Sequence, residues 1–541
     1  MSEKTCRIAI AQCNVCVGAI EDNTVKIISW IERAKEEHQA DVVIFPELVV
    51  TGYPPEDILL REELYQRVNV AMEGIAEASK EIYTIVGHPI LTEDNLIYNA
   101  ATLCRNGELV KSYCKRILPN YGVFDEARYF TPLVNQPVFE LDNLKLGIMI
   151  CEDGWSPEVS DEAARNGADI LIQLNASPFR VDKIEERMGV AAERVAETNL
   201  PMINVQMVGG QDALVFDGTS FLLDRNGDVL HQLPSFEESL SLATFTHKEG
   251  CWLPEMGQRL LANDPVEQRY RALVLAVRDY VQKNNFSGAL IGLSGGVDSA
   301  VTLAIAVDAL GPENVRGVLM PSQFTLDMSN EDAMILAGNL GVETQVVPIE
   351  PVFESFKTQL ADAFKDQAED VTEENLQSRI RGTLLMALSN KFGQLVLCTG
   401  NKSEVAVGYS TLYGDSAGAF DVLKDVYKTQ VYELAKYRNT LGEDIPERIL
   451  LRAPSAELRQ DQTDQDSLPD YEILDGILMD YIEEDMDAIS IAAKGFDIEL
   501  VNQIITLVKQ NEYKRRQSPL GPKLTPRAFD KDWRYPITSK F

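Results

Sequence analysis

The sequence lacks the features that mark several broad classes of protein. Its eight cysteines are too few for a disulfide framework in 541 residues, and it has only four histidines. Cys13 and Cys16 have metal-ligand spacing but no second pair to complete a zinc site, so we favour two core thiols over a redox pair. No apolar run approaches the roughly eighteen residues of a membrane span, and a strand begins too early to leave room for a signal peptide. We therefore expect a cytoplasmic protein without a membrane segment.

Positive charge is also scarce. The chain has 50 Lys and Arg residues against 84 Asp and Glu residues, a net charge of −34. This excess argues against nonspecific binding to nucleic acid or anionic membranes, because such binding requires basic side chains that neutralise phosphate. A nucleotide could still bind in a locally basic pocket. Hydrophobic residues make up 45% of the chain, as in soluble globular proteins, and the length allows two or three domains.

In the first half, short apolar runs alternate with amphipathic stretches, which predicts a layered α/β architecture rather than an all-β sandwich. The expected strands cover residues 7–12, 41–45, 83–87, 99–104, 145–151, 169–174 and 202–206. The expected helices cover 22–39, 62–80, 156–166 and 184–198. Glycines and prolines then interrupt the pattern. We expect a first domain over 1–246, a linker over 247–265 and a second domain over 266–541.

The second half resumes the alternation after a long expected helix over 266–284. Expected strands at 289–292, 315–319, 344–348 and 394–398 alternate with expected helices at 300–310, 330–340 and 375–391. This pattern predicts a doubly wound, open parallel sheet with helices on both faces. Such a sheet binds ligands at the carboxyl ends of its strands.

The turn after residues 289–292 has the composition of a phosphate site. A strand, two adjacent glycines and a helix direct backbone N–H groups and the positive helix end at one point. Ser294 and Ser299 add hydroxyls, and Asp298 offers a carboxylate for Mg²⁺. The alternative is a tight turn without a ligand. The run Ser-Gly-Gly-Val-Asp-Ser resembles the PP-loop of the ATP pyrophosphatases, which adenylate a substrate and release pyrophosphate.

Further polar residues follow in the same half. Thr399 and Glu404 come after an expected strand and could meet ATP and Mg²⁺, and Lys428 could reach a phosphate. Asn375 and Arg379 are four residues apart and therefore share one face of a helix, where a solvated arginine is the alternative.

Three residues in the first half supply a different chemistry. Glu47 follows an apolar strand, Cys151 follows another, and Lys115 lies in a conspicuous polar stretch between them. Together they offer a thiol nucleophile, a carboxylate base and an ammonium for a developing oxyanion. Taken singly, a core thiol, a turn-capping glutamate and a solvated lysine would be the simpler interpretations.

Taken together, the three residues resemble the Glu-Lys-Cys triad of the nitrilase superfamily over about residues 7–245. The resemblance implies an αββα domain with Cys151 as nucleophile, Glu47 as general base and Lys115 as transition-state stabiliser. Glu126 matches a second glutamate that supports the site in many members.

The stretch that begins at Asn175 resembles the glutamine-recognition segment of glutaminase members. This resemblance implies that Tyr121, Ser177 and Lys183 hold the α-amino and α-carboxylate groups of glutamine. Related chains often carry Arg where this one has Lys183, and Lys lacks the bidentate fork of Arg.

The whole chain resembles the glutamine-dependent, two-domain NAD synthetases. The motifs are Ser-Gly-Gly-Val-Asp-Ser, the Asn-Leu-Gln-x-Arg-x-Arg helix, Thr-Gly-Asn-Lys-Ser-Glu and the late Tyr-Lys-Arg-Arg-Gln. Without the resemblance, this last run would be interpreted as a solvated patch of basic residues. The implied ATP site is Gly292, Leu293, Ser294, Gly295, Gly296, Val297, Asp298, Ser299, Thr399 and Lys428. The implied deamido-NAD contacts are Asn375, Arg379, Glu404 and Lys514, with Mg²⁺ at Asp298 and Glu404.

The resemblance implies two coupled reactions. Glutamine is hydrolysed to glutamate and ammonia, and ATP adenylates deamido-NAD so that ammonia converts it to NAD. We expect a sheltered path for ammonia and a homo-oligomer.

One alternative is another PP-loop amidotransferase that makes GMP or a modified tRNA base. The other is a regulatory nucleotide-binding protein with an inactive nitrilase domain, which a complete Glu-Lys-Cys set disfavours.

Overall fold

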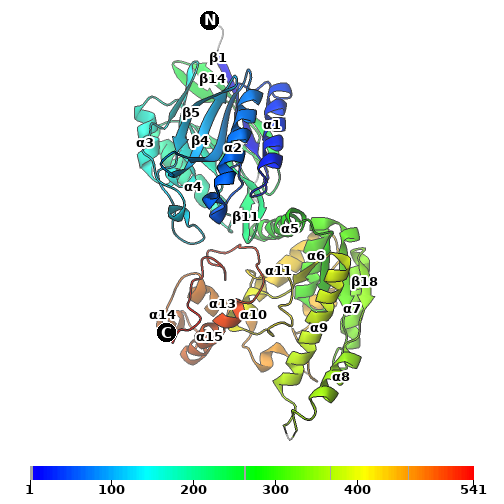
Figure 1. Cartoon of the computed structure of the whole chain (residues 1–541). Helices are drawn as coiled ribbons and strands as arrows, with labels where there is room; N and C mark the ends of the chain where they lie inside the picture. The colour runs from blue at the N-terminus through cyan, green and yellow to red at the C-terminus, as the bar shows by residue number, and fades with distance from the viewer. Residues whose placement is uncertain (1–3, 261–263, 366, 461, 541) are drawn as a thin grey trace. The chain divides into compact units, whose positions relative to one another are not determined.

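The computed structural model describes residues 4–260, 264–365, 367–460 and 462–540 (Figure 1). The chain divides into two compact units, Met1–Asn263 and Asp264–Phe541. Among the described helices, none is both long and apolar enough to cross a membrane.

The first unit contains two large sheets. The seven-stranded sheet has the order β15-β14-β1-β2-β3-β4-β5, and the six-stranded sheet has the order β13-β12-β9-β8-β7-β6. The strands of the first sheet are β1 (Lys4–Gln12), β2 (Val42–Ile44), β3 (Tyr83–Leu91), β4 (Ile97–Arg105), β5 (Glu108–Cys114), β14 (Ser239–Lys248) and β15 (Cys251–Pro254). Those of the second are β6 (Val138–Leu141), β7 (Leu144–Ile150), β8 (Ile170–Asn175), β9 (Met202–Gln206), β12 (Phe221–Leu223) and β13 (Val229–Gln232). A separate hairpin joins β10 (Val208–Gln211) to β11 (Leu214–Asp217).

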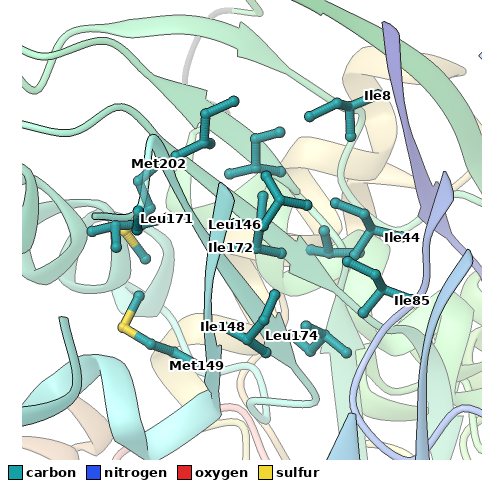
Figure 2. Close-up of a cluster of buried hydrophobic side chains, with 14 of the residues drawn as sticks. Ile8, Ile44, Ile85, Leu146, Ile148, Met149, Leu171, Ile172, Leu174 and Met202 are labelled. Carbon is teal, nitrogen blue, oxygen red and sulfur yellow. The ribbon is translucent and has the colours of Figure 1, made fainter. Parts of the chain in front are cut away.

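The two sheets pack against each other through alternating apolar side chains. Ile8 and Ile44 belong to the same buried cluster as Ile148 and Ile172, and Figure 2 shows these groups facing one another. The neighbouring Ala9 belongs to a second cluster with residues of two helices. Because successive side chains of a strand point to opposite faces, this alternation places the seven-stranded sheet between the other sheet and the helices.

Helices cover the outer faces of both sheets. The pair α1 (Ile20–Glu36) and α2 (Glu62–Ala78) covers the seven-stranded sheet, and α3 (Pro157–Arg165) and α4 (Lys183–Thr198) contribute to the cluster of the six-stranded sheet (Figure 1). The first unit therefore has the predicted αββα architecture.

Part of the expected linker over 247–265 is regular structure. Strand β14 continues to Lys248, and β15 pairs with it antiparallel, with Phe245 opposite Pro254. Gly250, with φ +84°, lies in the tight turn between the two strands. Gly250 and Pro254, which suggested a linker, belong instead to this edge hairpin. Residues 261–263 lie outside the described part of the chain.

The second unit is built on one parallel sheet with the order β18-β17-β16-β19-β20. Its strands are β16 (Ala289–Gly292), β17 (Val315–Leu319), β18 (Glu343–Val346), β19 (Leu395–Cys398) and β20 (Phe420–Asp421). The chain runs outward from β16 to β18 and then returns to β19 on the other side of β16. Adjacent strands whose connections leave in opposite directions form a topological switch point, where open α/β sheets bind ligands.

Helices pack on both faces of this sheet, as predicted. Leu290, Val318 and Val396 form a cluster with Phe353 of α8 and Ile380 of α9, while the alternate strand residues face the layer of α5, α6 and α11. The helices are α5 (Pro265–Lys283), α6 (Val297–Leu310), α7 (Asp327–Asn339), α8 (Glu350–Leu360), α9 (Val371–Phe392), α10 (Lys402–Val407), α11 (Lys428–Leu441), α12 (Glu447–Leu451), α13 (Tyr471–Ile482), α14 (Ala488–Ala492), α15 (Ile498–Gln510) and α16 (Glu512–Arg515). Helices α10, α13, α14 and α15 share a further core with Tyr427 and Trp533.

Candidate active sites

Cys151 lies at a sharp turn at the carboxyl end of β7. The chain passes directly from Ile150 into the 3-10 helix η3 (Cys151–Trp155), and Cys151 takes the positive φ of +46°. A non-glycine residue rarely adopts this conformation, and where it does the strain is often stored at a functional site. Gln173 donates to the Cys151 carbonyl oxygen at 2.7 Å, and Gly154 leaves room for the Gln173 amide, which a Cβ would approach to 2.3 Å.

Glu47 follows β2 in a turn that is pressed against β3. A Cβ on Gly87 would lie 2.4 Å from the Leu48 backbone nitrogen, so the glycine permits this close approach. The carboxylate of Glu47 accepts hydrogen bonds from Asn99 Nδ2 at 2.8 Å and from the Ala176 backbone N–H at 3.0 Å. These contacts fix the orientation of a fully buried carboxylate.

Lys115 joins two carboxylates. Its Nζ lies 2.9 Å from Glu47 Oε1 and 2.8 Å from Glu126 Oε2, with the side chains of Lys115 and Glu47 at 0% exposure. Tyr53 OH donates to Glu126 Oε1 at 2.9 Å. Burial opposes the charge of Lys115, but Glu126 and Glu47 raise the pKa of this ammonium well above its ordinary value.

The same burial affects the other ionisable groups. It raises the pKa of Glu126 to about 7, with Lys115 acting in the opposite direction. It also raises the pKa of the Cys151 thiol well above its ordinary value, and the nearby charge of Glu47 adds to this effect while Lys115 opposes it. The resting group is therefore a thiol beside a buried carboxylate that can accept its proton.

Two of the three residues expected to bind glutamine, Tyr121 and Lys183, lie next to η3. Tyr121 OH donates to both carboxylate oxygens of Glu152 at 3.1 Å, and Lys183 Nζ lies 3.9 Å from the centroid of the Trp155 ring. Burial lowers the pKa of Lys183, which also pairs with Glu186 at 3.1 Å. Sequence reasoning assigned no role to Glu152 or Trp155, although both stand in the short stretch that begins at the cysteine.

Ser177 is buried two residues beyond the end of β8. Its backbone N–H donates to Gln206 Oε1 at 3.2 Å, and its carbonyl oxygen accepts from Gln206 Nε2 at 2.5 Å. The amide of Gln206 thus fixes the backbone around the Ser177 side chain.

In the second unit, the predicted phosphate turn follows β16 and leads into α6. Gly295 has φ +77°, and a Cβ there would lie 2.3 Å from the Ser329 carbonyl oxygen, so only glycine fits. The hydroxyls of Ser294 and Ser299 lie 3.2 Å apart, and the Gly296 N–H donates to Ser294 Oγ at 3.2 Å. The turn sits at the carboxyl end of the central strand, as a phosphate site requires.

A cavity of about 310 Å³ opens beside this turn. Most of the residues expected to bind ATP and deamido-NAD line it: Gly292, Leu293, Ser294, Gly296, Val297, Asp298, Ser299, Thr399, Glu404, Lys428 and Lys514. Cavities of this size hold small ligands.

Asp298 and Glu404, the two expected metal ligands, both pair with the ammonium of Lys428 in this cavity. Lys428 Nζ lies 2.5 Å from Asp298 Oδ2 and 3.2 Å from Glu404 Oε1. Burial raises the pKa of Glu404 to about 8, although Lys428 opposes the shift, and the carboxylates in turn raise the pKa of Lys428 despite its burial. Within the described residues no cluster of three or more His, Cys, Asp or Glu side chains could hold a metal ion. A pair of carboxylates nevertheless fits Mg²⁺, which completes its shell with phosphate oxygens and water.

Asn375 and Arg379 do not line the cavity. They lie on α9, where Asn375 Oδ1 accepts from Thr411 Oγ1 at 2.8 Å and Arg379 Nε donates to the Leu412 carbonyl oxygen at 3.2 Å. Both residues hold the loop after α10 against the helix. Arg381 lines the cavity instead, and burial lowers its pKa to about 10. Two residues along a helix correspond to a rotation of about 200°, which explains why one arginine of the motif faces the cavity and the other does not.

Lys514 also contacts the loop after α10. Its Nζ donates to the carbonyl oxygens of Gly408 and Ser410 at 2.7 and 2.8 Å. Lys514 also lines the cavity, so the basic residue near the end of the chain is part of the site rather than a solvated surface charge.

Residues 452–458 form a wall of the cavity that the sequence did not indicate. Arg452 donates to the Gly295 carbonyl oxygen at 2.9 Å and to Ser329 Oγ at 2.6 Å, and Ser329 Oγ donates to Glu457 Oε1 at 2.5 Å. This segment has no regular structure and therefore no periodicity to recognise.

The two units match two family models. Residues 7–249 match the carbon-nitrogen hydrolase model, and residues 269–518 match the NAD synthase model. The fold and the two sites thus define a carbon–nitrogen hydrolase joined to an NAD synthase.

Full-length relatives define the family more narrowly. The chain is 48% identical over 538 residues to the glutamine-dependent NAD(+) synthetase of Acinetobacter baylyi and 43% identical over 573 residues to that of Thermotoga maritima, with 99% of each chain covered. It resembles the solved glutamine-dependent NAD⁺ synthetase of Acinetobacter baumannii in complex with ADP, with a TM-score of 0.80, 46% identity and coverage of 99% and 98% of the two chains. The chain belongs to the glutamine-dependent NAD(+) synthetase family.

Proposed function

We propose that this protein makes NAD from deamido-NAD, ATP and glutamine. The first unit hydrolyses glutamine to glutamate and ammonia. The second unit adenylates deamido-NAD, and ammonia then converts the adenylate to NAD with release of AMP. The observation that carries the proposal is the presence, in one chain, of a complete buried Cys-Glu-Lys site and a PP-loop cavity, together with 48% identity to a named relative over nearly all of its length.

In the proposed glutaminase, Cys151 attacks the side-chain amide carbon. Glu47 takes the thiol proton, which burial keeps on the sulfur in the resting state, and passes it to the leaving ammonia. Lys115, held charged by its two carboxylates, stabilises the oxyanion of the tetrahedral intermediate. Water then attacks the thioester with Glu47 as base, which yields glutamate and restores Cys151.

Glu126 keeps Lys115 in position and charged. Burial raises its pKa and the charge of Lys115 opposes the rise, so the charged states of the two groups depend on each other. Tyr121, Ser177 and Lys183 hold the α-amino and α-carboxylate groups of glutamine. The pairing of Tyr121 with Glu152 places an acceptor for an ammonium beside η3, and Lys183 supplies a cation for the carboxylate.

In the proposed synthetase, the turn 292–299 and Thr399 bind the phosphates and ribose of ATP. Mg²⁺ would be held by Asp298 and Glu404 and would supply positive charge that activates the α-phosphorus and stabilises the departing pyrophosphate. Lys428 contributes a second cation at the same place. The carboxylate of deamido-NAD attacks the α-phosphorus and forms an acyl-AMP. This step prepares the attack of ammonia, because an acyl-AMP is a far better electrophile than a carboxylate.

Deamido-NAD occupies the remainder of the cavity. Lys514 and Glu404 line that space and are the direct contacts we propose. Asn375 and Arg379, expected as contacts, are proposed to act through the loop that they hold. We further propose that ammonia reaches this site by a sheltered path, because free ammonia is mostly protonated at neutral pH, and that the enzyme works as a homo-oligomer.

Product analysis tests the function. The purified protein is incubated with glutamine, ATP and Mg²⁺, with either deamido-NAD or xanthosine monophosphate as acceptor. We expect glutamate, AMP, pyrophosphate and NAD in equal amounts with deamido-NAD only. AMP release with xanthosine monophosphate would favour a GMP-forming enzyme, and no glutamate in either reaction would favour a regulatory protein with an inactive hydrolase unit.

A further inference from the structure

Asp153 is a fully buried carboxylate two residues after the cysteine. Its Oδ2 accepts from the Ile150 backbone N–H at 3.1 Å and from Tyr113 OH at 2.9 Å. Its Oδ1 accepts from the backbone N–H groups of Arg116 and Ile117 at 3.1 and 3.0 Å. Both oxygens are therefore satisfied by two donors each.

These donors belong to two segments that no strand pairing connects. Ile150 ends β7, immediately before Cys151, whereas Tyr113, Arg116 and Ile117 surround Lys115 at the end of β5. Strand β5 is the edge of the seven-stranded sheet and β7 belongs to the six-stranded sheet. The Asp153 carboxylate is thus a cross-link between the two sheets at the point where nucleophile and ammonium meet.

The cross-link consists of four hydrogen bonds to one carboxylate. Hydrogen bonds to a carboxylate are about twice as strong as those between neutral groups. Removing the carboxylate would leave the buried N–H of Ile150 and the half-buried N–H groups of Arg116 and Ile117 without this acceptor. Burial raises the pKa of Asp153, while the N–H donors of Ile117 and Ile150 oppose the shift. None of these contacts involves glutamine or a reacting atom.

We propose that Asp153 is a positioning residue that fixes Lys115 relative to Cys151 during amide hydrolysis. The inference rests on the proposed glutaminase activity. A displacement of about 1 Å between reacting groups can cost roughly 100-fold in rate, so a loosened cross-link slows the chemical step without changing the contacts that bind the substrate. The expected signature is a lower kcat at an unchanged KM for glutamine.

The test compares Asp153→Asn with Asp169→Asn in the full-length enzyme. Asp169 is a matched control, because its Oδ2 accepts from the Lys145 N–H at 2.9 Å near the opposite end of the same strand, β7. Each protein is measured for kcat and KM with glutamine, for the rate of Cys151 alkylation by iodoacetamide, for Tm and for NAD formation from ammonium chloride. Tyr113→Phe, which removes one donor and leaves the carboxylate, serves as a second, milder variant.

We expect Asp153→Asn to lower kcat and the alkylation rate roughly 10- to 100-fold with KM for glutamine within twofold of wild type. Tyr113→Phe should lower kcat about two- to fivefold, and Asp169→Asn should leave kcat unchanged. Ammonia-dependent NAD formation should stay intact in all three variants. A folded Asp153→Asn protein with wild-type kcat and alkylation rate, or a Tyr113→Phe protein with wild-type kcat if Asp153→Asn does not fold, overturns the inference. If the wild-type enzyme itself does not hydrolyse glutamine, the proposed function fails instead.

Discussion

Replacement of Lys115 by methionine tests the buried charge cluster of the first unit. The change removes the ammonium from between Glu47 and Glu126 and leaves two carboxylates, both buried, facing a neutral side chain. Breaking a buried ion pair by removing one partner costs about 3–5 kcal/mol. Loss of an oxyanion stabiliser costs roughly 100- to 1,000-fold in kcat. We therefore expect a large loss of both stability and glutaminase activity.

A second substitution separates these two effects. Glu126→Gln removes one of the facing carboxylates, so Lys115→Met/Glu126→Gln should recover at least about 1 kcal/mol of the lost free energy of unfolding at pH 8. Glutaminase activity should stay low in the double variant, because the ammonium is still missing. Urea unfolding followed by tryptophan fluorescence is suitable, since Trp30, Trp155 and Trp252, three of the four tryptophans, lie in the first unit.

The pH dependence follows from the raised pKa of Glu126. Burial favours its neutral form, so folding shifts its pKa up from 4.5 to about 7. The stability that this shift contributes is fully present below pH 4.5 and is lost as the pH rises through about 7. Lys115 opposes this rise, so its removal should raise the pKa of Glu126 further, and the stability difference between Lys115→Met and wild type should be larger at pH 8 than at pH 5. A Lys115→Met protein within about 1 kcal/mol of wild type at pH 8, with a glutaminase kcat within about tenfold of wild type, would refute the charge cluster as described.

Three further predictions concern both units. Lys428→Met should abolish NAD formation from either glutamine or ammonia, with a loss of at least about 100-fold, and should leave binding of glutamine unchanged. Arg381→Ala should raise KM for ATP or deamido-NAD at least about tenfold. Arg379→Ala should mainly lower kcat, since of these two arginines Arg381 lines the cavity and Arg379 does not. Alkylation of Cys151 by iodoacetamide should continue to accelerate above pH 9, because burial raises the pKa of the thiol well above its ordinary value.

Each of these three predictions would be contradicted by a specific result. NAD formation at a wild-type rate in the Lys428→Met enzyme would separate that lysine from the reaction. A stronger effect of Arg379→Ala on KM would place its guanidinium, rather than that of Arg381, against the substrate. A plateau of the alkylation rate near pH 7 would show a thiolate at rest.

Much of the fold could be predicted from the sequence. Largely apolar strands such as β7 and β8 and their alternation with amphipathic helices indicated both the αββα unit and the parallel sheet. Strand β5 was not predicted, because three of its seven residues are charged or polar, its first three residues are exposed and the next two are half-buried. The end of β14 and all of β15 were placed in the expected linker, because Gly250 fits a hairpin turn and an irregular linker equally well.

The candidate sites could be predicted where a recognisable motif groups their residues. Glu47, Lys115 and Cys151 are far apart in the sequence, and the resemblance to a Glu-Lys-Cys triad is what grouped them; the structure pairs Lys115 with Glu47. The choice between Arg379 and Arg381 could not be made, since it depends on how α9 is rotated against the sheet. The contribution of residues 452–458 was not visible, because an irregular segment carries no period that relates it to the cavity.

The measurement that tests the central claim most directly uses Cys151→Ala. The variant and the wild-type enzyme are supplied with ATP, Mg²⁺ and deamido-NAD, first with glutamine and then with ammonium chloride, and NAD is quantified. Two separate sites in one chain predict that the variant makes no NAD from glutamine but makes it from ammonium chloride at close to the wild-type rate. Loss of both activities in a folded variant, or retention of the glutamine-dependent one, would contradict the account.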